Sequence, residues 1–87
     1  MINPATITEE MLDIYYTVQR YHYQEDVKAL LADDDHFERD GIEDDKLIDT
    51  AVAILMRNYQ ADAGSYWDNI EAAISTAIIY IREGIAA

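Results

Sequence analysis

Residues 43–59, EDDKLIDTAVAILMRNY, decide the expected fold. Three acids, Glu43, Asp44 and Asp45, stand at the start of this stretch, where the partial positive charge of a helix N-terminus favours carboxylates. The apolar positions that follow cover half of a helix circumference or more, which is wider than the apolar stripe of an ordinary surface helix. They are Leu47, Ile48, Ala51, Val52, Ile54, Leu55, Met56 and Tyr59. We therefore expect a central helix of a helical bundle.

Residues 65–84 predict a further helix. Ser65 and Asp68 have the spacing of a capping box, in which a hydroxyl and a carboxylate three residues later satisfy free backbone N–H groups. Gly84 supplies a C-terminal stop, because glycine readily adopts the left-handed backbone that ends many helices. One face of this helix is apolar, and it should enter the core: Tyr66, Trp67, Ile70, Ala73, Ile74, Ala77, Ile78 and Ile81.

The N-terminal part predicts one helix or two. Thr6 and Glu9 repeat the capping-box spacing. Two apolar stripes follow at helical spacing on different faces: Met11, Ile14, Tyr15, Val18 and His22 on one, and Leu12, Tyr16, Tyr23, Val27, Leu30 and Leu31 on the other. A single straight helix would need neighbours on both sides. We expect instead a break near residues 21–24 and a short second helix to about Ala32, because the acids at positions 25 and 26 favour a new helix N-terminus.

Together these segments predict an all-α fold, a small three- or four-helix bundle with an acidic connecting loop. Residues 1–87 should form one acidic helical domain, with a radius of gyration of about 12 Å for a compact chain of this length. No segment alternates apolar and polar residues for long enough to form a strand, and no internal repeat is visible. The sequence predicts neither a secretion signal nor a membrane span, since its longest apolar run is residues 77–81. We expect a cytoplasmic protein.

Negative charge is concentrated in one connecting segment. The chain holds 18 Asp and Glu residues against 6 Lys and Arg, for a net charge of −12. Residues 33–45 contain eight of the acids and one base, Arg39, which gives −7 of that −12. The acids are Asp33, Asp34, Asp35, Glu38, Asp40, Glu43, Asp44 and Asp45. Either this is a solvated loop that keeps the protein soluble, or it is a docking surface that presents carboxylates at spacings comparable with nucleic-acid phosphates.

This charge excludes some classes of partner. It repels DNA, RNA and anionic lipid, so we expect no direct nucleic-acid binding, no membrane binding and a charged partner with a basic surface. The chain contains no cysteine, which removes disulfides, thiolate metal sites and thiol nucleophiles.

No metal site is predicted. A calcium-binding helix-loop-helix needs glycine at the sixth loop position and glutamate at the twelfth. Neither the register that starts at Asp33 nor the one that places Gly41 sixth has both. A loose divalent-cation site at Asp33, Asp35 and Glu38 is the weaker alternative.

Enzyme chemistry is not predicted either. His22 and His36 belong to no paired motif, and the sequence has no nucleophile elbow, Gly-rich phosphate loop or His-Glu-x-x-His spacing. We expect a protein that is not an enzyme, with no catalytic residue and no cofactor.

The aromatic residues have two interpretations. Tyr15, Tyr59, Tyr66 and Trp67 fall on apolar helix faces, and we expect them in the core. Tyr16 and Tyr23, like Tyr21, fit that interpretation less well. Tyrosine combines a large contact area with few rotatable bonds and is a common anchor of protein interfaces.

On the last helix, Ile79 lies opposite the apolar face. We expect an isolated exposed side chain there. The small residues beside it, Ala72, Ser75 and Thr76, would also allow a second helix to approach, so a homodimer through this helix is a secondary hypothesis.

The favoured hypothesis is an acidic inhibitor that mimics nucleic acid on the basic face of a larger nucleic-acid-binding protein. Its partner-binding residues would be Asp33, Asp34, Asp35, Glu38, Asp40, Glu43, Asp44, Asp45, Tyr16 and Tyr23. In size and charge, though in no motif, the chain is similar to small inhibitors of host defence carried by phages and other mobile elements, including anti-CRISPR proteins.

The alternative is a helical adaptor module, monomeric or homodimeric, whose acidity serves solubility. A third hypothesis is a composition adapted to high salt, since the chain has only two lysines, Lys28 and Lys46.

Overall fold

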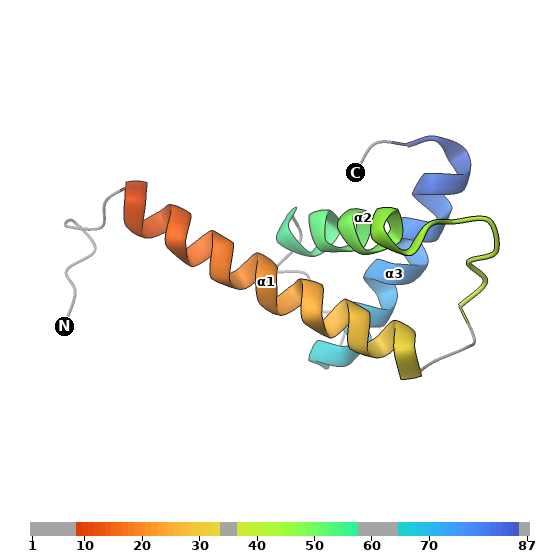
Figure 1. Cartoon of the computed structure of the whole chain (residues 1–87), viewed down its shortest axis with the longest axis horizontal. Coiled ribbons are helices and arrows are strands. Elements are labelled where there is room, and N and C mark those ends of the chain that lie inside the picture. Colours follow the sequence, from red (N-terminus) through yellow and green to blue (C-terminus); the bar gives the residue numbers. More distant parts are fainter. Residues whose placement is uncertain (1–8, 34–36, 58–64, 86–87) are drawn as a thin grey trace.

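The computed structural model describes residues 9–33, 37–57 and 65–85, and the regular structure of these residues is entirely helical. Helix α1 (Glu9–Asp33), α2 (Asp44–Arg57) and α3 (Tyr66–Glu83) follow one another along the chain (Figure 1). Helix α2 packs against both α1 and α3, and α1 also contacts α3. The expected all-α class is confirmed for the described residues, with three helices.

The core is built mainly from α2 and α3. Each of these helices contributes five buried apolar residues: Leu47, Ile48, Ala51, Val52 and Leu55 from α2, and Ile70, Ala73, Ile74, Ala77 and Ile78 from α3. Helix α1 adds Val27 and Leu31, both from its C-terminal half. Helix α2 packs more extensively against α1 and α3 than these two pack against each other, so it is the central helix, as its wide apolar surface predicts.

The ends of α3 are as the sequence predicts. The Ser65 side chain accepts a hydrogen bond from the Asp68 N–H, and the Asp68 carboxylate accepts one from the Ser65 N–H, both at 3.2 Å. At the other end Gly84 has a φ of 69°, in the left-handed region that favours glycine. Its N–H donates to the Ile81 carbonyl, and the Ile85 N–H donates to the Tyr80 carbonyl at 2.8 Å. These bonds satisfy backbone groups that a helix end leaves without helical partners.

The expected break in the first helix is wrong. Helix α1 is continuous through residues 21–24, because residues 9–33 contain no glycine or proline to interrupt it. The expectation also assumed that both apolar stripes are buried. In the structure Met11, Ile14 and Val18 are exposed, and burial is confined to the later residues of the other stripe. The capping box proposed at Thr6 lies outside the described residues.

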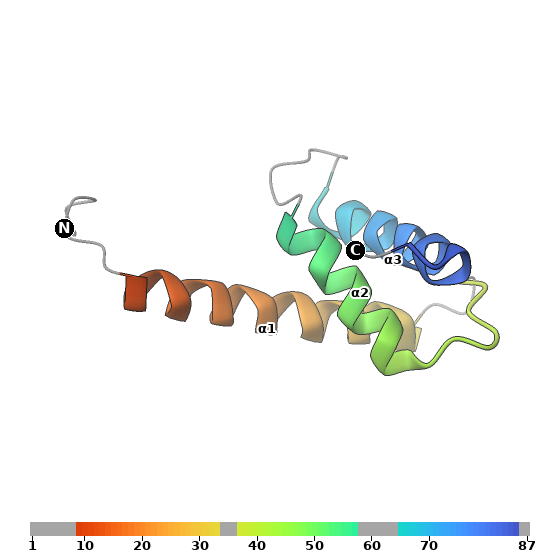
Figure 2. The same ribbon diagram turned by 90° about the horizontal axis from the view of Figure 1, so that it is seen from above.

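The N-terminal half of α1 projects from the rest of the molecule (Figures 1 and 2). Its 25 residues make a helix of about 37 Å, whereas the 14 residues of α2 reach only about 21 Å. We call residues 9–22 the α1 arm, and residues 23–33 together with α2 and α3 the helical body. The radius of gyration is 14.6 Å, larger than the expected value of about 12 Å, and the projecting arm contributes to this difference.

Three aromatic residues expected in the core are exposed. Tyr15 is 58% exposed on the α1 arm, and Tyr66 and Trp67 are 45% and 49% exposed. The last two stand in the first turn of α3, before the buried stripe begins at Ile70. Tyr59 lies outside the described residues. Ile79 is 53% exposed, as expected.

Truncation of a core side chain should destabilise the body strongly. Leu47 and Ile74 are fully buried, so Leu47→Ala and Ile74→Ala should each lower the free energy of unfolding by about 2–5 kcal/mol through lost burial and a residual cavity. Ile79→Ala removes an exposed side chain and should change it by about 0.5 kcal/mol or less. Urea denaturation followed by circular dichroism measures all three. Equal losses in the three variants would contradict the assignment of the core.

Candidate functional site

The described acids of residues 33–45 gather at one end of the helical body. The C-terminus of α1, residues 37–43 and the N-terminus of α2 lie together there, at the yellow and light green end of the chain in Figures 1 and 2. All six described acids are exposed, and we call them the acidic end: Asp33, Glu38, Asp40, Glu43, Asp44 and Asp45. Asp33 is the last residue of α1 and therefore belongs to a helix, not to the expected connection. Asp34, Asp35 and His36 lie outside the described residues.

Residues 37–42 are attached to the body at several points. Phe37 is buried in the core at 7% exposure. The Arg82 guanidinium of α3 donates to the Glu38 carbonyl at 2.7 Å. The Ile42 N–H donates to the Arg39 carbonyl at 3.0 Å, and Gly41 supplies the positive φ of 82° in this turn. These contacts hold the backbone that carries Glu38 and Asp40.

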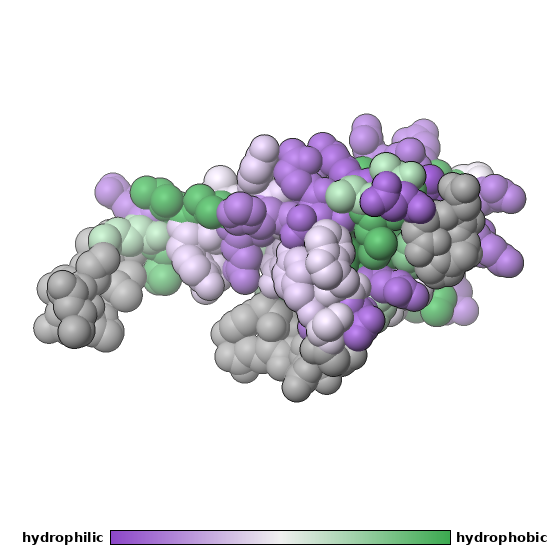
Figure 3. Space-filling model, turned by 90° about the horizontal axis from the view of Figure 1, so that it is seen from below, coloured by the Kyte–Doolittle hydropathy of each residue, from purple (hydrophilic) through white to green (hydrophobic). Residues whose placement is uncertain are grey.

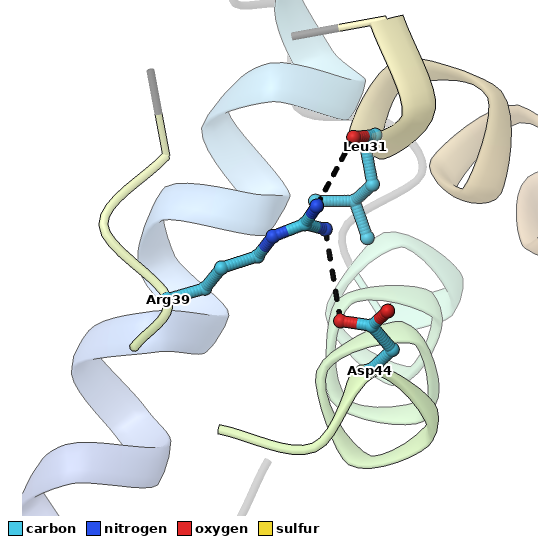
Figure 4. A network of polar contacts seen from close by, with 3 residues as sticks. All are labelled: Leu31, Arg39 and Asp44. Carbon is cyan, nitrogen blue, oxygen red and sulfur yellow. Dashed lines mark hydrogen bonds and ion pairs between the residues drawn. The ribbon is translucent and has the colours of Figure 1, made fainter. Parts of the chain in front are cut away.

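Arg39 connects the end of α1 with the start of α2. Its Nη2 donates to the Leu31 carbonyl at 3.3 Å, and its Nη1 lies 3.7 Å from Oδ1 of Asp44 (Figure 4). The last turn of α1 contains no basic residue, so the Arg39 guanidinium supplies the positive charge that a helix C-terminus favours. Asp44 is 68% exposed, and an ion pair with an exposed partner contributes at most about 1 kcal/mol. Arg39 thus offsets one carboxylate of the acidic end.

A second polar and aromatic cluster joins the middle of α1 to the start of α3. The rings of Tyr23 and Tyr66 are stacked with centroids 6.4 Å apart, and the Trp67 ring meets Tyr66 edge-on at 5.5 Å. The Tyr66 hydroxyl donates to the Asp26 carboxylate, and Gln19 Nε2 donates to the Tyr23 hydroxyl at 3.4 Å. Tyr23 is therefore engaged within the molecule, with its ring partly buried against the core.

The predicted anchors do not adjoin the acidic end. Tyr16 is 49% exposed on the α1 arm and lies 17 residues before Asp33, about 25 Å away along the helix. Tyr23 precedes Asp33 by ten residues, or about 15 Å. The structure places the six described acids at one end of the helical body and leaves the two tyrosines on a different part of α1.

Sequence reasoning missed the residues that attach the acidic end to the body. The burial of Phe37 had a local signal, because it is the one phenylalanine in the chain and stands among acids. Arg39 is the one base among those acids and had a similar signal. Arg82 and the bond between Tyr66 and Asp26 had none, since their partners are 44 and 40 residues away in the sequence.

Among the described residues, at least two grooves lie beside α1. The larger, of about 590 Å³, is open and lies where the α1 arm leaves α2; Arg20, Asp49, Met56 and Arg57 are among its lining residues. The smaller, of about 170 Å³, lies at the acidic end beside Lys28, Arg39 and Asp44. Within the described ranges no three His, Asp or Glu side chains converge as metal ligands. No described helix is long and apolar enough to cross a bilayer.

Comparison with protein-family models, with curated proteins and with solved structures finds no match to this chain. The functional interpretation therefore depends on the site itself.

Tyr66 should make the stability of the protein depend on alkaline pH. Partial burial of the phenol, followed by the hydrogen bond to Asp26 and the charge of that carboxylate, raises the pKa of Tyr66 above its ordinary value of 10.0. The folded state then holds this proton more tightly than the unfolded state. The stabilisation is complete below pH 10.0 and is lost as the pH rises above that value.

We expect Tyr66→Phe to cost about 0.5–1 kcal/mol at neutral pH through the lost hydrogen bond. The difference from the wild type should shrink as the pH is raised above about 10. Asp26→Asn keeps a hydrogen-bond acceptor for Tyr66 and removes the negative charge. This variant should therefore lose less of its free energy of unfolding at alkaline pH than the wild type does. Urea denaturation at a series of pH values measures both. A constant difference between wild type and Tyr66→Phe would refute the coupling.

Proposed function

We propose that this protein is an acidic inhibitor that acts as a nucleic-acid mimic on the basic, nucleic-acid-binding face of a larger cytoplasmic protein. Among known proteins, anti-CRISPR proteins and similar inhibitors from phages and mobile elements represent this mode of action. The observation that carries the proposal is the acidic end: six exposed carboxylates of one short segment, of which Arg39 pairs with one in the described part of the chain.

The attachment of this segment supports recognition of a fixed surface. Buried Phe37 and the bond from Arg82 to the Glu38 carbonyl hold the backbone in place before any partner binds. Binding then orders fewer groups, and less affinity is lost to conformational entropy. The same contacts hold like charges near one another, which costs stability. A cluster of cations on a partner would relieve that repulsion.

Electrostatics also specifies how the complex should respond to salt. A basic groove that binds phosphates attracts the acidic end through the same Coulomb energy, which raises the association rate and falls with ionic strength. Part of the affinity should come from release of the counterions that surround the two charged surfaces. The complex should therefore be strong at low salt and weaken steeply as salt is added.

The direct test is capture of the partner from the native host with residues 1–87 as bait. The captured protein is then challenged with DNA and RNA. A mimic and the nucleic acid should exclude one another. Simultaneous binding would contradict the proposal and favour the adaptor hypothesis.

Charge removal tests the site itself. In Glu38→Gln/Asp40→Asn/Asp45→Asn three charges are removed from the acidic end, while Asp44 is kept because it pairs with Arg39. We expect affinity for the captured partner to fall at least tenfold, since each variant position loses a Coulomb contact. Glu10→Gln/Asp13→Asn/Glu25→Gln removes the same number of charges from exposed positions on α1 and should have a much smaller effect. Equal losses in the two variants, measured by calorimetry, would rule out a localised site.

The α1 arm favours the adaptor as the second candidate. Several of its large apolar side chains are exposed, among them Leu12, Tyr16 and Tyr21, and such surfaces mark interaction sites. An adaptor that binds through them would show weak salt dependence. It would tolerate loss of the acids and would be sensitive to substitution of Tyr16.

A further inference from the structure

The α1 arm carries an apolar stripe that faces away from the core of its own molecule. Met11, Ile14, Val18 and Tyr21 are 42%, 65%, 50% and 58% exposed. Val18 lies nine residues before buried Val27, which is two and a half turns of helix, so the two side chains point to opposite sides of α1. Tyr15 borders this stripe at 58% exposure. We call these five residues the outer stripe.

The spacing of the outer stripe is that of a coiled-coil seam. Positions 11, 14, 18 and 21 alternate in steps of three and four residues, which is the a and d pattern of a heptad repeat. The stripe contains no charged residue, and the next position in the repeat is Glu25. Figure 3 shows apolar side chains on the arm, whereas much of the helical body visible in that view is hydrophilic. The seam thus extends over the arm and ends where the body begins.

The area of the stripe fits a helix pair. Five large side chains about half exposed present roughly 500 Å² of apolar surface, if a fully exposed one presents about 200 Å². A standard interface buries about 800 Å² on each partner, of which about 60% is apolar. The outer stripe supplies about that amount.

We propose that the α1 arms of two copies of this chain pair in antiparallel orientation through their outer stripes, to form a homodimer. In this register Ile14 packs against Val18 of the partner subunit, and Met11 packs against Tyr21 of the partner subunit. The interface is the same patch on both copies, as two-fold symmetry requires. It is separate from the acidic end and from the exposed face of α3 at Ile79.

Charge selects the antiparallel orientation. Each chain carries a net charge of −12, and α2 and α3 lie beside the C-terminal half of α1 (Figure 1). Parallel pairing would place two acidic bodies side by side, whereas antiparallel pairing places them at opposite ends of the helix pair, where salt screens their repulsion more effectively. It also brings the acidic start of one arm, with Glu10 and Asp13, near the part of the other arm that carries Arg20.

The dimer should respond to salt in the opposite sense to a complex with a basic partner. The outer stripe associates through burial of apolar surface, while the two net charges repel each other. Added salt screens that repulsion and should strengthen the dimer. The dimer and the proposed inhibitory function can therefore be tested, and rejected, independently. The first is measured with the purified chain alone, and the second needs the captured partner.

Mass measured against protein concentration tests the pairing. Analytical ultracentrifugation of the full chain should show a monomer–dimer equilibrium in the micromolar range, at least threefold tighter at high than at low salt.

Ile14→Glu/Val18→Glu places carboxylates in the seam and should leave a monomer at all concentrations. Leu12→Glu/Tyr16→Glu makes the same exchange at residues of the other stripe and should still dimerise, with circular dichroism as the check that both variants are helical. A wild-type chain that remains monomeric to several hundred micromolar, or a dimer lost only in the Leu12→Glu/Tyr16→Glu variant, would overturn the proposal.

Disulfide trapping tests the orientation in this cysteine-free chain. A mixture of Ile14→Cys and Val18→Cys chains, one of them tagged, should form the mixed disulfide faster than either chain links to itself. Dominant self-linkage of Ile14→Cys would indicate parallel pairing and would reject the antiparallel register.

Discussion

The structure depends on two differences between its helices. One is how much of the helix circumference is apolar, and the other is the length of the helix. Helix α2 has apolar residues around so much of its circumference that it needs a neighbour on two sides, and α1 and α3 fill those positions. It is also the shortest of the three, with 14 residues against 25 in α1. Its partners can therefore bury only the surface that lies beside it. The core ends where α2 ends, and the α1 arm continues beyond it.

The acidic end shows how a small body can hold concentrated charge. Repulsion among carboxylates favours separation of α1 from α2, so the segment between them needs contacts that oppose it. Burial of Phe37 supplies apolar contact, and two arginines bind backbone carbonyls at Leu31 and Glu38. Because these guanidinium groups bind backbone carbonyls, they hold the backbone in place and neutralise few of the carboxylates. Attachment and negative charge thus coexist in the same segment.

The sequence was informative where a local pattern determines local structure. The capping box at Ser65, the terminal glycine at position 84 and the wide apolar surface of residues 47–55 each predicted what the structure has. The sequence predicted burial wrongly where burial depends on the length of a neighbouring helix. Leu12 and Tyr16 belong to the stripe that is buried further along α1, yet they are exposed because they lie beyond the end of α2. The outer stripe has the spacing of a core face, but it lies on the side of α1 opposite buried Val27. The bonds from Arg82 and Tyr66 cross at least 40 residues of chain and had no local signal.

Because α1 is continuous, it would fix the distance between the two acidic ends of a dimer. A rigid rod joins the outer stripe to the acidic end, and the residues midway along the stripe lie about 25 Å from Asp33. Two chains paired through that stripe would present two docking surfaces on opposite ends of a stiff assembly, about 50 Å apart. A target with two basic sites at a matching separation would then be engaged twice, and the second contact would benefit from a high effective concentration. A break in the helix, as the local charge pattern had suggested, would have left that separation undefined.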